Sequence, residues 1–191
     1  MIFEKKNFYD NGFAGPFKIC DTNNRSKILN ERYIPKNKYQ WSKSIHEVSH
    51  EVQKLAANEI ILEKVKKILG DDILLWGSCF IEQKPNIEHS WHTDLEYNYW
   101  DGVTVWIGLK NLSKDTPLSL ISNSHNLNTF PQLLAEKGMQ VKNDESVLKA
   151  SLKEDDKCKL RNLFLEDGEF VMWSGKLWHK TKNFGIFCFN R

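Results

Sequence analysis

Hydrophobic residues recur at helical spacing between residues 42 and 72, in the run SKSIHEVSHEVQKLAANEIILEKVKKILGDD. The positions that follow this pattern are Ile45, Val48, Val52, Leu55, Ile60, Leu62, Val65, Ile68 and Leu69. Steps of mostly three and four residues place such side chains on one face of an α-helix. Asn58 is a candidate break, and Gly70 is a typical helix end. We therefore expect one or two amphipathic helices in this part of the chain.

From Ile73 onward the pattern changes to short runs rich in aromatic and β-branched residues. The runs are ILLWGSCFIEQ, HSWHTDLEY, GVTVWIGLK, PLSLISNSH, LFLEDGEFVMWSG and GIFCFNR. Turn signals separate them, which is typical of β-strands. Helices followed by many short strands indicate an α+β protein that is mainly β. We expect a β-sandwich or jelly roll with the N-terminal helices packed on its outside.

The chain of 191 residues is long enough for one domain with a sizeable core and short for two. We therefore expect a single domain over residues 1–191. An N-terminal strand and helices should occupy about residues 1–72, and the β core residues 73–191. A long polar stretch near residues 126–160 interrupts that core. It predicts a surface excursion with a helix or two, and such insertions are also where active-site lids lie.

Charge and composition narrow the classes of function. The formal net charge is +2 and the lysines are scattered, so a concentrated basic face for nucleic acid is not expected. No apolar run approaches the roughly 18 residues of a membrane span, and the charged N-terminus does not resemble a signal peptide. The four cysteines are far apart without a CxxC pair, which favours thiols over disulfides. These features predict a cytoplasmic protein and leave its oligomeric state open.

The segment HSWHTDLEYNYW holds a candidate metal site. His92 and Asp94 are two positions apart, so a β-strand would turn an imidazole and a carboxylate to the same face. His179, in the aromatic setting SGKLWHKTKN, is a candidate third ligand. Two histidines and one carboxylate form the facial triad that suits Fe(II) and leaves positions open for a cosubstrate and O₂. Taken alone, the short motif also fits a polar residue at a strand edge.

A second candidate is HEVSH, residues 46–50, which fits the HExxH motif of zinc hydrolases. On one helix, His46 and His50 would bind zinc and Glu47 would activate water. The glycine and third histidine that extend this motif in the metzincins are missing after His50. An ordinary solvated helix face explains the same residues. The two candidate sites exclude each other as the active site.

Taken in order along the chain, several segments resemble the phytanoyl-CoA dioxygenase family of non-haem Fe(II)- and 2-oxoglutarate-dependent oxygenases. The segments are NFYDNGFAGPFKI, LAANEIILEKVKKILGDDILLWGSCF, HSWHTDLEYNYWDGVTVWIGLKN, TPLSLISNSHN and LEDGEFVMWSGKLWHKTKN. Asn123 stands where a glycine is usual in the family, and Glu169 where an aspartate is usual. The resemblance extends over most of the chain. It implies a double-stranded β-helix, the cupin-like form of the jelly roll.

The resemblance implies that His92, Asp94 and His179 bind the iron, with no catalytic residue beyond these ligands. At the position of Asp94, halogenating relatives have a small residue. The carboxylate of Asp94 therefore makes this chain resemble the hydroxylating relatives instead. The implied reaction hydroxylates a substrate while 2-oxoglutarate is converted to succinate and CO₂. An arginine after the second histidine normally anchors the cosubstrate. Arg191 is the candidate for that role, although it also fits a second arginine that family members often have at the end of this strand.

Further candidates surround the implied iron. Thr181, Thr104 and Lys84 are candidates for contacts to 2-oxoglutarate. The candidates for the substrate pocket are Trp91, Tyr97, Trp100, Trp106 and His125. Aromatic walls favour a small to medium organic molecule as the substrate. The alternatives are a relative that binds a metal or ligand without catalysis, and the zinc hydrolase.

Overall fold

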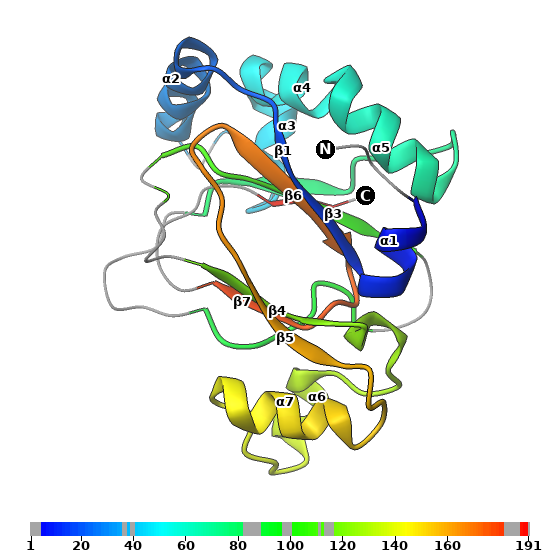
Figure 1. Cartoon of the computed structure of the whole chain (residues 1–191). Helices are drawn as coiled ribbons and strands as arrows, with labels where there is room; N and C mark the ends of the chain where they lie inside the picture. The colour runs from blue at the N-terminus through cyan, green and yellow to red at the C-terminus, as the bar shows by residue number, and fades with distance from the viewer. Residues whose placement is uncertain are drawn as a thin grey trace.

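The structure is a computed structural model, and it describes residues 5–35, 38, 41–81, 89–96, 101–110, 112, 117–181 and 188–190. Two antiparallel sheets and two groups of helices are arranged in layers (Figure 1). Within these ranges, no helix is long and apolar enough to cross a lipid bilayer.

Most of the helices precede the β-rich part of the chain. They are α1 (Lys5–Asn11), α2 (Thr22–Asn30), the 3₁₀ turn η1 (Glu31–Tyr33), α3 (Ile45–Val48), α4 (His50–Ala56) and α5 (Glu59–Leu69). The strands are β1 (Phe13–Lys18), β2 (Gly77–Cys79), β3 (Val103–Ile107), β4 (Leu118–Ser122), β5 (Lys159–Leu163), β6 (Glu169–Ser174), β7 (His179–Thr181) and β8 (Cys188–Asn190). Between β4 and β5 lie the turn η3 (Ser124–Asn126), α6 (Pro131–Glu136) and α7 (Asp144–Leu152).

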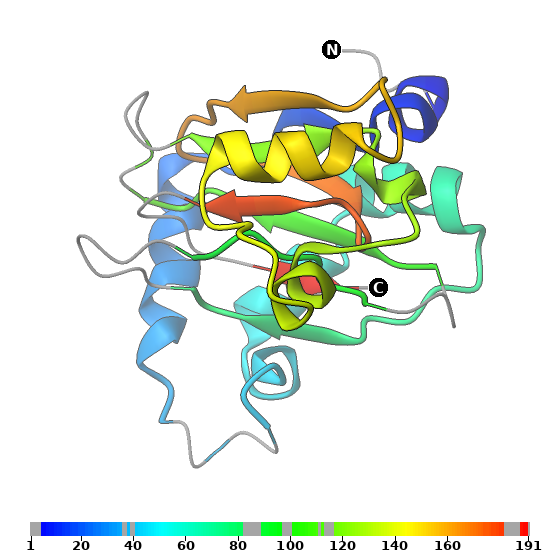
Figure 2. The same ribbon diagram turned by 90° about the horizontal axis from the view of Figure 1, so that it is seen from below.

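One sheet has five strands in the order β1-β6-β3-β8-β2, and the other has three in the order β5-β4-β7. Paired strands in both sheets run antiparallel. Helices α2–α5 lie over the outer face of the five-stranded sheet, whereas α6 and α7 lie against the three-stranded sheet (Figures 1 and 2). The predicted α+β class, with N-terminal helices outside the β core, is therefore confirmed.

Alternation along β3 separates two hydrophobic cores. Val103, Val105 and Ile107 belong to the cluster that includes the buried side chains of α3, α4 and α5. Trp106, which points to the other face, belongs to the cluster that includes Leu120 of the second sheet. All of these side chains are nearly inaccessible to solvent. A strand that is covered on both faces is apolar at successive positions, which explains the continuous run VTVWI.

The predicted helical segment at residues 42–72 is divided into three helices. Ser49 is extended, with φ −108° and ψ 112°, and its side chain accepts a hydrogen bond from the backbone N–H of Val52 at 3.1 Å. Asn58 begins α5 in the same way, because its side chain accepts a hydrogen bond from the N–H of Ile60 at 2.9 Å. Short polar side chains that satisfy such N–H groups favour a helix start. Gly70 follows the last residue of α5, as the sequence predicts.

The strands differ from the predicted runs in length and number. Within its described residues, 73–81, the run ILLWGSCFIEQ yields only β2, and the segment around His92 forms an isolated β-bridge instead of a strand. Strand β5 is not predicted by the sequence, yet it pairs with β4 along five residues. Because β5 is an edge strand with exposed polar positions, its sequence lacks the apolar pattern of a buried strand. The insertion near residues 126–160 contains α6 and α7 and ends at this sheet edge.

Candidate metal centre

His92, Asp94 and His179 lie together, and their ligand atoms are all within 4.8 Å of one another. Within the described ranges, no other group of three His, Cys, Asp or Glu side chains has this geometry. His92 and Asp94 come from the segment that precedes β3, whereas His179 is the first residue of β7. The structure thus brings together the three residues that the sequence marks as candidate iron ligands.

Each candidate histidine is oriented by a backbone carbonyl group. The Nδ1 atom of His92 lies 2.8 Å from the carbonyl oxygen of Ser90, and Nδ1 of His179 lies 2.8 Å from that of Leu177. A carbonyl oxygen only accepts hydrogen bonds, so Nδ1 carries the proton in both rings. In the neutral form of each ring, Nε2 is then the atom with the free lone pair, and in both histidines it lies 3.7 Å from Oδ1 of Asp94. Metal-binding histidines are commonly fixed by hydrogen bonds of this kind.

Asp94 is oriented by two donors from the five-stranded sheet. Its Oδ2 atom accepts hydrogen bonds from Thr104 Oγ1 on β3 at 2.6 Å and from Trp173 Nε1 on β6 at 3.0 Å. Burial acts to raise the pKa of Asp94, but the two histidines and these two hydrogen bonds outweigh it, and the pKa lies below its usual range. The carboxylate is therefore ionised near neutral pH, as a metal ligand must be.

The surroundings of His92 favour its neutral state. Burial, together with the nearby His179, lowers the pKa of His92 to about 4, although Asp94 acts in the opposite direction. The two rings have their centroids 4.2 Å apart, so two positive charges would repel each other there. A neutral imidazole is the form that binds a metal.

The donor set fits a divalent transition metal. Two imidazole nitrogens and one carboxylate oxygen converge, and each side chain is held by hydrogen bonds that leave its metal-binding atom exposed to the others. This set of ligands is typical of non-haem Fe(II) sites that keep coordination positions open. The arrangement can therefore bind one ion from one side and leave its other side to small molecules.

The three candidate ligands line a hollow of about 440 Å³. Thr181 and Trp106, which the sequence predicts near the iron, also line it. Lys43 lines it as well, and it is the only Lys or Arg among the described lining residues. The positive charge of Lys43 contributes to the lowered pKa of His92. The hollow therefore has a cationic side chain within electrostatic reach of the candidate ligands.

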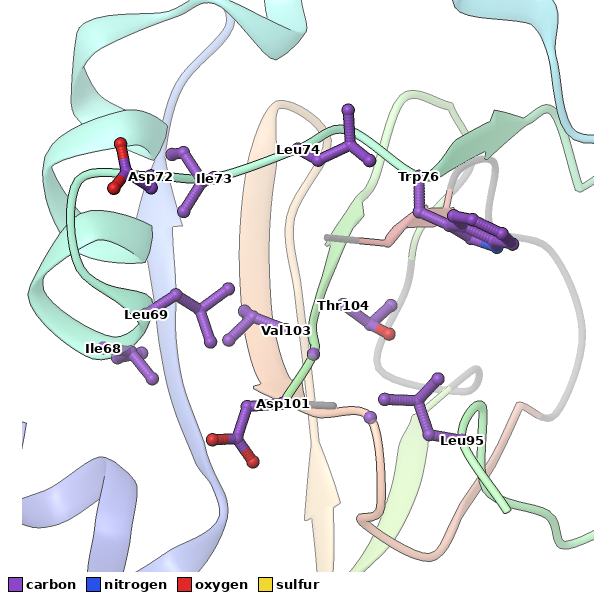
Figure 3. A pocket seen from close by; sticks show the side chains of 12 residues that line it. Ile68, Leu69, Asp72, Ile73, Leu74, Trp76, Leu95, Asp101, Val103 and Thr104 are labelled. Atoms are coloured by element: carbon purple, nitrogen blue, oxygen red, sulfur yellow. The ribbon is translucent and has the colours of Figure 1, made fainter. Parts of the chain in front are cut away.

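Figure 3 shows a second hollow, of about 450 Å³. The end of α5 and the segment after it supply apolar side chains, among them Leu69, Ile73 and Trp76. Thr104 and Leu95 line the hollow from the other side (Figure 3). Leu95 follows Asp94 in the sequence, and the hydroxyl group of Thr104 donates to Asp94. The side chain of Thr104 therefore lines the apolar hollow and also donates a hydrogen bond to the candidate ligand Asp94.

Two of the predicted pocket residues are not brought to the metal hollow. Trp91 is 4% exposed, and its indole N–H donates to Asp144 of α7 at 3.3 Å. His125 lies in η3, where its Nε2 atom is 2.9 Å from the carbonyl oxygen of Tyr9. Four further predicted residues lie outside the described ranges, namely Lys84, Tyr97, Trp100 and Arg191.

The HEVSH residues do not share the single helix face that a zinc hydrolase needs. Helix α3 ends at Val48, Ser49 is extended, and His50 begins α4. The Nδ1 atom of His46 lies 2.9 Å from Oγ of Ser78, whereas the side chain of His50 is 72% exposed. The break in the helix therefore separates the two imidazoles.

A family model, phytanoyl-CoA dioxygenase, matches residues 19–184. This match spans most of the chain and includes all three candidate ligands. The chain belongs to the phytanoyl-CoA dioxygenase family. Asn123 stands where a glycine is usual in the family, and its φ is 71°. Asparagine tolerates this left-handed conformation better than most residues. No curated protein sequence matches the chain.

Solved structures with low sequence identity share the fold. HygX from Streptomyces hygroscopicus, with iron bound, is 14% identical with a TM-score of 0.73, and the match covers 99% of this chain and 86% of that one. The non-heme monooxygenase ThoJ in its apo form is 15% identical with a TM-score of 0.68, covering 97% and 74%. The epimerase SnoN in complex with Fe³⁺, α-ketoglutarate and nogalamycin RO is 11% identical with a TM-score of 0.67, covering 97% and 79%.

Sequence reasoning missed two residues of the centre. Trp173 lies in the run EFVMWS, and alternation along that strand gives a signal for its inward face, which it shares with Val171. Nothing in the local pattern marks Lys43. It reaches the hollow because the neighbouring Ser44 forms a parallel bridge with Ser78 at the edge of the large sheet. A pairing between distant segments of this kind has no local signal.

Proposed function

We propose that the protein is an Fe(II)- and 2-oxoglutarate-dependent dioxygenase that hydroxylates a small organic molecule. The observation that carries this proposal is the oriented group of His92, Asp94 and His179 in a chain of the phytanoyl-CoA dioxygenase family. Because His179 belongs to the three-stranded sheet and both donors to Asp94 belong to the five-stranded sheet, we infer that the sheets form a double-stranded β-helix around the metal.

In this proposal, the Nε2 atoms of His92 and His179 and Oδ1 of Asp94 hold the iron. Iron and 2-oxoglutarate, once bound, supply the chemistry that yields succinate and CO₂ and adds one oxygen atom of O₂ to a C–H bond. The protein orients the ligands and limits the access of water. Trp173 does both, because its indole donates to Asp94 and its ring centroid lies 4.7 Å from that of His179.

The cosubstrate has two carboxylates, and the one remote from the iron needs a cationic partner. We propose Lys43 for this role because it lines the metal hollow and carries the required charge. Thr181 lies two positions beyond His179 on β7, so it shares a face with that ligand and is placed to donate a hydrogen bond. The hydroxyl hydrogen of Thr104 is engaged by Asp94. The roles of Arg191 and Lys84 as contacts to 2-oxoglutarate stay predictions.

The apolar hollow beside the centre supports a substrate with an apolar portion. Pockets of this size and lining bury most of the surface of a small organic ligand. HygX was solved with nickel, 2-oxoglutarate and hygromycin B bound, and SnoN with nogalamycin RO. These occupants support a substrate of the small-molecule class for this chain. The SnoN structure is described as an epimerase, so hydroxylation is the part of the proposal that the substrate's fate must test.

A metal- or ligand-binding relative without catalysis is the alternative function. It would have the same fold and the same three ligands, so only the consumption of 2-oxoglutarate separates it from a dioxygenase. A zinc hydrolase is not proposed further, because the HEVSH residues are divided between α3 and α4.

The test is to add Fe(II) and 2-oxoglutarate to the protein without O₂ and to record its visible absorption. Joint binding produces a weak metal-to-ligand charge-transfer band, which we expect in the wild type and not in His92→Ala. His50→Ala is the matched control, because His50 is exposed and is not among the described residues that line the hollow. Succinate should then form once O₂ is admitted. A wild type without the band would contradict the proposal, and a band without succinate would favour the binding relative.

A further inference from the structure

Gln132, in the first turn of α6, binds the backbone between the two ligands of the motif. Its Oε1 atom accepts a hydrogen bond from the N–H of Thr93 at 3.1 Å, and its Nε2 atom donates to the carbonyl oxygen of Thr93 at 2.8 Å. Nε2 also donates to Oε1 of Glu96 at 3.4 Å. Thr93 stands between His92 and Asp94 in the sequence. One side-chain amide thus pairs both backbone groups of a residue, as a neighbouring strand would.

This contact lies on the edge of the ligand segment that faces away from β7. On the β7 side, His92 exchanges both backbone hydrogen bonds with His179. In an extended chain, the backbone groups of the next residue point to the opposite edge. The residues that the structure describes place no strand on that edge, and Gln132 occupies it instead. Thr93 is 3% exposed, so its backbone groups need a protein partner.

Helix α7 makes a second contact next to the ligands. Asp144, its first residue, accepts the hydrogen bond from Trp91 and forms an ion pair with Lys180. Trp91 precedes His92, and Lys180 follows His179. Trp91 and Lys180 are each 4% exposed, whereas the side chain of Asp144 is 28% exposed, so both contacts are partly buried. Both helices of the insertion, α6 and α7, therefore touch residues adjacent to the candidate ligands.

We propose that Gln132 is a positioning residue for the metal centre. It holds the segment from His92 to Asp94 so that these two side chains converge with His179 before a metal binds. The inference rests on the proposed function, because it requires that the three residues bind a metal. The insertion that contains α6 then raises the affinity for the metal through its contact with the edge of the ligand segment that faces away from β7. This positioning role is separate from the role of a lid that closes over the active site, which the sequence suggests for the same insertion.

The proposal implies coupling in both directions. If the contact between α6 and Thr93 favours metal binding, metal binding must stabilise that contact by the same free energy, because coupling between two sites is reciprocal. The backbone amides of α6 should therefore exchange with deuterium more slowly when the metal is bound. Because a bound metal also stabilises the whole fold, only slowing over α6 that exceeds the slowing in the rest of the chain reports this coupling.

The test measures Co(II) binding by calorimetry and by the visible d–d absorption, which reports the geometry of the ligands. Gln132→Met keeps the length of the side chain and removes both hydrogen bonds to Thr93. Glu136→Met is the matched control, because Glu136 lies exposed on the same helix. We expect Gln132→Met to bind Co(II) about 10- to 100-fold more weakly, with an altered spectrum, as typical for the loss of a group that orients ligands. Glu136→Met should match the wild type.

Deuterium exchange of the wild type with and without Co(II) is a second measurement that does not depend on how a variant folds. The expected result is exchange over α6 that slows more in the presence of Co(II) than exchange in the rest of the chain does. An unchanged Kd and spectrum for Gln132→Met, or exchange over α6 that slows no more than in the rest of the chain, would overturn the positioning role and leave the proposed function standing. A wild type that bound no Co(II) would overturn both.

Discussion

The backbones of His92 and His179 form an antiparallel bridge in which each N–H donates to the carbonyl oxygen of the other at 3.0 Å. Side chains of residues paired in this way project to the same face of the pair. Two candidate ligands from distant parts of the chain are therefore fixed relative to each other by their own backbones. Preorganisation of this kind lowers the ordering cost of metal binding.

Loss of one donor to Asp94 should weaken metal binding. Thr104→Val keeps the shape of the side chain and removes the 2.6 Å hydrogen bond to Oδ2. We expect the Kd for Co(II), measured by calorimetry, to rise about tenfold. Ser119→Ala is the control, because it removes a 2.8 Å hydrogen bond to Asn162 at another buried position. If both variants bound Co(II) like the wild type, the orienting role of Thr104 would be wrong.

Removal of Asp144 should destabilise the fold. Asp144→Ala takes a carboxylate away from the buried ammonium group of Lys180, and removing one partner of a buried ion pair costs about 3 kcal/mol or more. Urea unfolding should show a clearly lower midpoint. Glu145→Ala breaks the exposed pair with Lys149 on the same helix and should leave the midpoint close to that of the wild type. Coinciding midpoints for the two variants would show that the buried pair does not stabilise the protein.

Cys20 and Cys158 should resist alkylation in the folded protein. Burial raises the pKa of Cys20 to about 11 and raises that of Cys158 as well. The thiolate is the reactive form, so little of it is present at pH 8. Mass spectrometry after iodoacetamide treatment should find both residues unmodified in the native state and modified in urea. Rapid labelling of either residue under native conditions would contradict their burial.

The same pKa shift gives a dependence of stability on pH. A pKa of Cys20 raised in the folded state means that the unfolded chain loses its thiol proton first. The stabilisation is therefore complete below the ordinary value of 9.0 and is lost as the pH rises towards about 11. Chemical denaturation between pH 8 and pH 11 should show this decrease, and Cys20→Ala should show a smaller one.

Metal binding should not depend on HEVSH. We expect Glu47→Ala and His50→Ala to bind one equivalent of Co(II), as the wild type does, because neither residue lies among the described residues that line the metal hollow. Asp94→Ala should bind none. Metal analysis of the purified variants after dialysis is the measurement. Loss of the metal in the HEVSH variants would restore the hydrolase interpretation.

The sequence is sufficient to identify the candidate ligands and insufficient to identify the side chains that orient them. A spacing of two places His92 and Asp94 on one face in any extended conformation, so their pairing needs no knowledge of the partner segment. Gln132 and Asp144 act through contacts that depend on how the insertion folds back on the sheet. No local pattern of residues encodes such a contact.

The fold shows the same division. The end of α5 at Gly70 and the buried strand β3 follow from local signals, namely a glycine after the last helical turn and a continuous apolar run. The break at Ser49 escapes sequence reasoning because the helical spacing continues across it, from Ile45 to Val52. The energy of a cap at Ser49 competes with a continuous helix, and hydrophobic periodicity does not report that competition.

Asp94 is tied to β3 and β6 of the five-stranded sheet, whereas His179 is part of β7 in the three-stranded sheet. An ion bound to both side chains is a cross-link between the two sheets. By mass action, a metal at about 100 times its Kd raises the free energy of unfolding by about 2.7 kcal/mol. Chelation of the metal would therefore remove the cross-link between the two sheets. It would lower the unfolding temperature of the whole domain as well as stop any turnover.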